Sequence, residues 1–245
     1  YFFSSASLQD ILRRHIQQYG DLTTLPDKVA IQLNDTHPAV SVAELMRLLI
    51  DVHEMEFDPA WDITRATFSY TNHTLLPEAL ESWPVPLFER LLPRHMQLVY
   101  AINAKVLRQA RKERGYDEDQ IRSVSVIDEG GERRVRMGNL AFIGSHSING
   151  VSALHTDLMK QTVFSDLHGL YPDRINNKTN GITPRRWLMQ CNPGLFQLIR
   201  EAIGDDFMDD AEALSALAPV AGDAEFRARF AAVKRDNKIR LANLV

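Results

Sequence analysis

The segment from Asn177 to Trp187 gathers polar side chains that suit the binding of a sugar or a phosphate. It reads Asn-Lys-Thr-Asn-Gly-Ile-Thr-Pro-Arg-Arg-Trp, with amides, hydroxyls, cationic groups and an indole close together. Asn180-Gly181 favours a turn and Pro184 fixes one φ angle, so the flanking polar groups are held in place. A polar domain linker explains the same composition, because loops are polar more often than they are sites. Taken alone, the segment leaves both interpretations open.

Polar residues also follow two predicted strands, at the point where each strand ends. The strands are residues 28–33 and 63–70, and the residues that follow them are Asn34, Asp35, Thr36 and His37, and Asn72, His73 and Thr74. In open α/β sheets, ligands collect at the carboxyl ends of the strands. Taken singly, however, Asp35 is a common turn former and His37 or His73 a common structural imidazole. The repeated placement makes a binding site at these strand ends the alternative to test.

Four strings along the chain closely resemble the glycogen, starch and maltodextrin phosphorylase family. They occur in the family's order and at similar spacing, and they are Leu33–Pro38, Tyr70–Thr74, Gly144–Val151 and Asn177–Trp187. The resemblance covers residues 1–245 but only the middle of a family chain several times longer. It implies a GT-B-like α/β fold of two Rossmann-like lobes facing a cleft. Residues 1–176 would end the N-terminal domain, and residues 177–245 would begin the C-terminal cofactor-binding domain.

The resemblance implies a glycosyltransferase, a 1,4-α-glucan phosphorylase that releases terminal glucose as glucose 1-phosphate with retained configuration. Its substrates would be α-1,4-glucan and inorganic phosphate, its cofactor pyridoxal 5′-phosphate, and its assembly a homodimer. The family's cofactor-holding lysine motif has no match here, and Lys178 does not fit it, so the chain alone is expected to be inactive. A non-catalytic sugar-binding or structural segment is the alternative. A glycoside hydrolase is a third, although no carboxylate pair can be assigned acid and base roles from sequence.

Seven positions match site residues of the resembling family. They are His73 and Asn180 at the glucosyl unit being cleaved, Asp35 and His37 beside the glucose pocket, Gly150 and Val151 close to sugar and cofactor, and Trp187 beside the cofactor ring. The resemblance gives His73 and Asn180 positioning roles at the sugar's hydroxymethyl group. Arg185 and Arg186 do not match the family's phosphate-binding residues, so they are expected to pair with carboxylates or backbone carbonyls.

Two strand–turn–helix units predict the layered α/β fold that would position these residues. A capping box is predicted at Ser41 and Glu44, ahead of the first unit's helix. Further helices are predicted from Ser7 to Gly20, from Pro93 to Arg114, from Ser152, and at the end with Phe226, Phe230, Val233, Leu241 and Leu244 on one face. A hairpin is predicted for residues 123–137 around Gly130-Gly131, and a strand for residues 140–143.

Composition limits the classes of partner and compartment. The chain is 44% hydrophobic and 24% charged with a formal charge of −4, which argues against a general nucleic-acid or membrane-surface binder. Its single Cys191 allows no internal disulfide, and the histidines show no metal-ligand spacing, so no metal is expected. No apolar run is long enough to span a membrane. We therefore expect a soluble, cytoplasmic protein, and the missing initiator Met predicts a piece of a longer chain.

Overall fold

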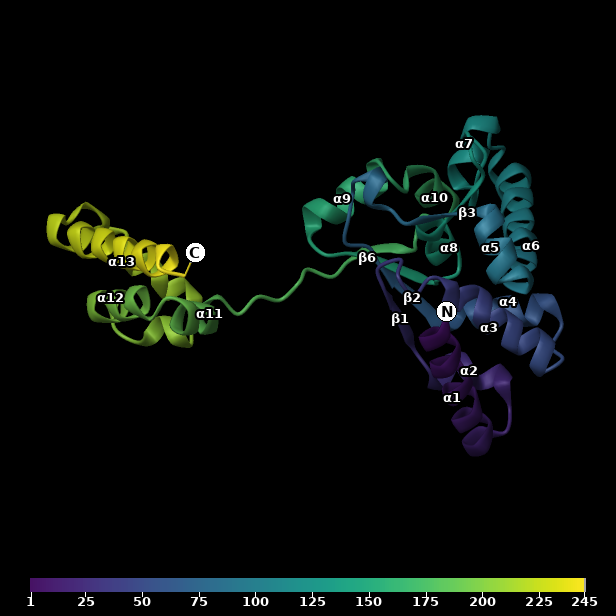
Figure 1. The fold of residues 1–245 in the computed structure, drawn as a ribbon, viewed down its shortest axis with the longest axis horizontal. Helices are drawn as coiled ribbons and strands as arrows, with labels where there is room; N and C mark the ends of the chain where they lie inside the picture. The colour runs from purple at the N-terminus through teal and green to yellow at the C-terminus, as the bar shows by residue number, and fades with distance from the viewer. Residues whose placement is uncertain (245) are drawn as a thin grey trace. The chain divides into compact units, whose positions relative to one another are not determined.

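The computed structural model describes residues 1–244, apart from the side chain of Ala79, and divides into two compact units (Figure 1). The units are Tyr1–Asn180 and Gly181–Val245, of which Val245 lies outside the described residues. The predicted boundary between residues 176 and 177 falls inside a strand that belongs to the first unit. Assignment of the two units to the family's domains stays a prediction.

The first unit is built on a parallel sheet of strand order β1-β2-β6-β7. The strands are β1 (Ile31–Asn34), β2 (Phe68–Thr71), β6 (Ser147–Gly150) and β7 (Ile175–Asn177). One register row is apolar and buried, and consists of Leu33, Tyr70, Ile148 and Ile175. The next row is polar, and consists of Asn34, Thr71, Asn149 and Asn176. Because all four strands are parallel, their carboxyl ends meet at one edge.

Helices surround this sheet, and a small antiparallel sheet of order β3-β5-β4 lies beside it. The helices are α1 (Phe2–Tyr19), α2 (Leu25–Lys28), α3 (Val40–Arg47), α4 (Phe57–Thr67), α5 (Val85–Leu91), α6 (Pro93–Gln109), α7 (Glu118–Val124), α8 (Met137–Ile143), α9 (Ala153–Gln161) and α10 (Ser165–Leu170). The small sheet has β3 (Ser82–Pro84), β4 (Ile127–Asp128) and β5 (Arg134–Arg136). Short 3₁₀ turns are η1 (Leu22–Thr24) and η3 (Pro77–Ala79), and π-helical turns are η2 (Leu48–Val52) and η4 (Ala110–Arg114). The mixed α/β class predicted from sequence is confirmed.

The second unit is helical over its described residues. It contains α11 (Pro184–Cys191), α12 (Pro193–Ile203) and α13 (Ala224–Ala242), with the 3₁₀ turns η5 (Asp206–Met208), η6 (Ala211–Leu217) and η7 (Pro219–Gly222). Its small core centres on Leu198, Ile199 and Phe207. The predicted last helix is confirmed as α13, but its apolar residues stay accessible, since Phe230 is 39% and Leu241 62% exposed.

Several predicted elements match the structure closely. Gly20 ends α1 in the left-handed region at φ 74°, which glycine adopts without strain. α6 begins at Pro93 as predicted, and continues through η4 to Gly115. The predicted hairpin is formed by β4 and β5. Ser152 caps α9 by accepting a hydrogen bond from the His155 N–H.

One predicted strand was wrong, and the strand predicted for residues 63–70 is confirmed only for residues 68–70 in β2, because tertiary burial outweighs local propensity. Residues 63–67 close helix α4 instead of opening a strand, and the Thr67 hydroxyl there donates to the Ile63 carbonyl at 2.8 Å. Residues 140–143 belong to α8, where every residue is buried. An apolar run buried on all sides shows no helical period, so it cannot be told from a buried strand. The strand predicted for residues 28–33 begins only at Ile31.

Two predicted helix starts were also wrong. α1 already begins at Phe2, so Ser7 lies inside the helix. The N-cap of α3 is Ala39, which has no side-chain cap, and Ser41 and Glu44 form no capping box. Glu44 instead faces the neighbouring helices, where its carboxylate finds stronger donors than a backbone N–H.

Glu44 is a fully buried carboxylate that joins three helices. It accepts hydrogen bonds from Arg47 of α3 (2.8 Å from both Nε and Nη2), His95 Nε2 of α6 (2.5 Å) and the Ser5 hydroxyl of α1 (2.6 Å). Burial by itself would raise the pKa of Glu44, but these donors lower it from 4.5 to about 2. The ionised form is therefore the one that the fold stabilises.

We predict that Glu44→Gln lowers the free energy of unfolding at pH 7 by roughly 3 kcal/mol, the amount that the lowered pKa represents. Since the folded pKa lies below the unfolded one, this stability is present above pH 4.5 and fades as the pH falls through about 2. Urea unfolding at several pH values measures it. Glu118→Gln, at an exposed ion pair, is the control and should cost less than about 0.5 kcal/mol. An equal loss for Glu44→Gln at pH 7 and pH 3 would contradict the electrostatic explanation.

Candidate functional site

The carboxyl edge of the parallel sheet brings together most of the residues predicted from sequence. Asp35 follows β1, and His73 follows β2. Gly150 is the last residue of β6, and Val151 comes directly after it. His73 is exposed, and its Nε2 lies 2.7 Å from Asn34 Oδ1 at the end of the neighbouring strand. Because an amide oxygen only accepts, His73 Nε2 is the donor in this contact, and in the neutral ring Nδ1 keeps a lone pair.

Asn180 joins this edge through the backbone. The Lys178 N–H donates to the Gly150 carbonyl at 3.1 Å, and the Asn180 N–H donates to the Val151 carbonyl at 2.9 Å. These bonds continue the β6–β7 ladder beyond the last paired residues. The exposed side-chain amide of Asn180 is therefore carried beside Val151 and is free to bind a polar ligand.

Gly150 allows helix α9 to pack directly on the end of β6. A Cβ at Gly150 would lie 2.4 Å from Thr156 Oγ1, 2.9 Å from Thr156 Cα and 2.9 Å from His155 Cδ2. Thr156 Oγ1 in turn donates to the Ser152 carbonyl at 2.8 Å and lies 3.2 Å from Asn177 Oδ1. α9, β6 and the end of β7 are thus in close contact, and we call this contact the site floor.

Asp35 shapes the turn after β1. It is one of the non-glycine residues with positive φ, at 65°, a region that Asp tolerates better than most residues. Its N–H donates to the Thr71 carbonyl at 3.0 Å, and its Oδ1 accepts the Thr36 N–H at 2.7 Å. The buried Thr36 hydroxyl then donates to Glu81 at 3.0 Å. These contacts support a role for Asp35 in positioning the turn.

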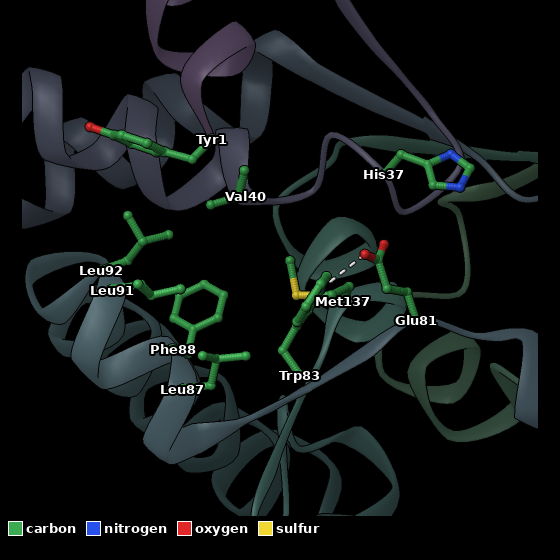
Figure 2. A pocket seen from close by; sticks show the side chains of 10 residues that line it. All are labelled: Tyr1, His37, Val40, Glu81, Trp83, Leu87, Phe88, Leu91, Leu92 and Met137. Carbon is green, nitrogen blue, oxygen red and sulfur yellow. Dashed lines mark hydrogen bonds between the residues drawn. The ribbon is translucent and has the colours of Figure 1, made fainter.

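His37 lies in a different environment. It lines a mostly apolar cavity of about 250 Å³ together with Tyr1, Val40, Glu81, Trp83, Leu87, Phe88, Leu91, Leu92 and Met137. Figure 2 shows His37 and Glu81 at one end and Leu91 and Leu92 at the other, with the Trp83 indole donating to Glu81 at 3.0 Å. Within residues 1–244, His37 has no hydrogen bond to the other predicted site residues.

Sequence reasoning missed a buried set of polar residues under this edge. Asn72 is fully buried, and its Oδ1 lies 2.9 Å from His155 Nε2, while its Nδ2 donates to the Tyr70 hydroxyl at 3.1 Å. Burial lowers the pKa of His155 and raises the pKa of Tyr70. The sequence places Asn72 among the polar residues after the second strand, but does not predict its burial or its partners. The position of His155, in the first turn after the Ser152 cap, was the available signal.

Trp187 belongs to the second unit. It lies on α11 and is 62% exposed, so its indole face is open. The neighbouring Arg185 donates from Nη1 to the Met208 carbonyl at 2.8 Å, which confirms the expected pairing with a backbone carbonyl.

In the part of the chain that the structure describes, no group of acidic, histidine or cysteine side chains could hold a metal ion. Across those same residues, no helix has the length and apolar character needed to cross a membrane.

A parallel sheet with helices and with polar residues along its carboxyl edge is typical of open α/β proteins, in which ligands collect at that edge. The family model described as carbohydrate phosphorylase matches residues 1–245, and the chain belongs to this family. It is 50% identical to the brain form of glycogen phosphorylase from Homo sapiens over 99% of this chain and 30% of that protein. Identity is 49% to glycogen phosphorylase from Synechocystis over 100% of this chain and 29% of that protein, and 47% to the human muscle form. The chain spans about 30% of the length of these relatives.

We predict that Gly150→Ala destabilises the first unit by about 1–3 kcal/mol, since the added methyl group has to displace the backbone of α9. Thermal and urea unfolding measure the change. Gly131→Ala is the matched control, because nothing lies within 4 Å of a Cβ there. If both substitutions cost the same, the close packing of α9 on β6 would not be the cause.

Proposed function

We propose that this chain forms part of a 1,4-α-glucan phosphorylase, which transfers the terminal glucosyl unit of an α-1,4-glucan to inorganic phosphate with retention. The observation that carries the proposal is the arrangement of His73, Gly150, Val151 and Asn180 along one sheet edge. Family membership and the names of the glycogen phosphorylase relatives support it. The two-lobed GT-B architecture, the division at residues 176 and 177, and a homodimer are parts of the same proposal.

His73 and Asn180 are suited to reading a sugar hydroxyl. His73 donates from Nε2 to Asn34, and in the neutral form of this exposed ring Nδ1 is an acceptor. The Asn180 backbone N–H is bonded to Val151, and its side-chain amide offers both donors and an acceptor. A site built on such groups leaves them unpaired when the hydroxyl is missing. That loss gives discrimination as well as affinity.

Gly150 and Val151 contribute shape to the proposed pocket. The backbone carbonyls of Gly150 and Val151 accept hydrogen bonds from the segment that follows β7. The backbone is therefore rigid where a sugar would approach. Asp35 fixes the turn after β1, which carries His37 toward the apolar cavity. We place both residues beside the glucosyl unit and assign them no proton transfer.

In this proposal, side chains of this chain would line the site of pyridoxal 5′-phosphate but would not form the covalent bond that holds it. The open indole of Trp187 offers a flat face for a planar ring. Lys178 does not match the family's cofactor-holding lysine motif, and Arg185 is committed to a backbone carbonyl. When bound, the cofactor would supply a phosphate that exchanges a proton with the substrate phosphate. The chain's own residues bind and orient the sugar.

Phosphate-dependent release of glucose 1-phosphate tests the proposal. The complete protein should produce it from α-1,4-glucan only when inorganic phosphate is present, whereas a hydrolase would release glucose without phosphate. A sugar-binding or structural segment would produce neither. The 245-residue chain alone, given pyridoxal 5′-phosphate and phosphate, is expected to release none, and activity at the level of the complete protein would contradict this.

In the complete enzyme, we predict that His73→Ala and Asn180→Ala each lower kcat/KM for glucan by roughly tenfold to a thousandfold, about 1.4 to 4 kcal/mol of transition-state stabilisation. The losses should be much smaller for a glucan whose terminal sugar lacks the 6-hydroxyl, because the deleted contact is already missing there. Steady-state kinetics on both substrates, with cofactor content measured alongside, provide the test. Equal losses on both substrates, or loss of cofactor, would show that these side chains maintain the fold.

A further inference from the structure

Asn72 is a fully buried polar residue under the candidate site. Its backbone N–H, its Nδ2 and its Oδ1 each have a hydrogen-bond partner. Its N–H donates to the Asn149 carbonyl at 3.0 Å, and its Nδ2 donates to the Tyr70 hydroxyl at 3.1 Å. Its Oδ1 accepts from His155 Nε2 at 2.9 Å. Asn72 thereby links the end of β2 to β6 and to α9, immediately before His73.

His155 contacts both halves of the site floor. Its backbone N–H is fixed by Ser152 Oγ at 3.1 Å, in the first turn of α9. Its ring packs on Gly150, since Cδ2 would lie 2.9 Å from a Cβ there. The ring atom bonded to Cδ2, Nε2, lies 2.9 Å from Asn72 Oδ1. The His155 ring therefore lies between Asn72, which directly precedes His73, and the backbone of Gly150 and Val151.

We propose that His155 is a positioning residue of the glucosyl pocket: its neutral imidazole, protonated on Nε2, holds Asn72 and thereby fixes His73 relative to Gly150 and Val151. This inference rests on the proposed phosphorylase function. The donor is essential, because an apolar residue at this position would leave the Asn72 carbonyl oxygen buried without a partner. An unpaired buried acceptor costs more than the bond itself contributes.

Three substitutions in the complete enzyme separate this role from simple packing. His155→Leu removes the donor, His155→Gln can supply one from its side-chain amide, and His168→Leu is the control. His168 lies on α10, is partly buried like His155, and likewise has a pKa lowered mainly by burial. Among the described residues it has no hydrogen bond to the candidate site.

We expect His155→Leu to lower kcat/KM for glucan by about tenfold or more, and His155→Gln to recover most of that loss. His168→Leu should stay within about twofold of the parent. In a double-mutant cycle, His155→Leu should have little further effect once His73 is Ala, because it acts through the same contact. Failure of Gln to rescue, or full additivity with His73→Ala, would overturn the proposal.

Hydrogen–deuterium exchange of the complete protein gives a readout that does not depend on activity. His155→Leu should speed exchange in the peptides that contain residues 72–74 and 150–152, and leave the hairpin of β4 and β5 unchanged. His155→Gln should restore slow exchange. Unchanged or uniformly faster exchange would overturn the positioning role. If the parent protein releases no glucose 1-phosphate, the proposed function fails while this measurement still decides the role of His155.

Discussion

The register of the parallel sheet is the constraint on which the candidate site depends. Leu33, Tyr70, Ile148 and Ile175 form one buried row, and the polar row of Asn34, Thr71, Asn149 and Asn176 follows it directly. Side chains of the polar row also bond across strands, as Thr71 Oγ1 does to Asn149 Oδ1 at 2.7 Å. A slip of one residue would turn the apolar row to the other face. The buried row therefore fixes where each strand ends, and the candidate residues lie within the next three residues: Asp35, His73, Val151 and Asn180.

Stability and recognition use different polar residues in this unit. The most strongly bonded carboxylate, Glu44, lies among α1, α3 and α6, where three donors surround it. Its bonds stabilise the helical layer, and they leave no group free for a ligand. At the sheet edge the opposite holds, because His73 and Asn180 are exposed and each is held by a single contact. Under the proposed function, these exposed side chains with a single hydrogen-bonded group are the ones that bind the sugar.

The sequence predicted the α/β class, the long helix from Pro93 and the edge location of most candidate residues, because these follow from strong periodicity and turn chemistry. It failed at residues 140–143 and 63–67. The first is buried on all sides and carries no period, and the second is rich in β-branched residues that packing nevertheless holds in a helix. Glu44 was misplaced for a related reason, since its partners Ser5 and His95 are distant in sequence. The hydrogen bond between His155 and Asn72 could not be predicted from the sequence, because the two residues are 83 positions apart.

The histidines show why residue type alone could not identify the site. His15 bonds the Asp21 carbonyl, His95 bonds Glu44, and His155 bonds Asn72, and each of these three rings is buried or partly buried. His73 makes a similar bond to Asn34, yet its ring is exposed and its second nitrogen stays free. A histidine can orient a neighbour when its ring is enclosed, and it can meet a ligand only when one nitrogen is open. His146 is exposed in the same way, with Nε2 3.3 Å from Ser69 Oγ, but it precedes β6. In the proposed function, exposure together with its place after β2 makes His73 the ring that binds, and enclosure makes His155 the ring that positions it.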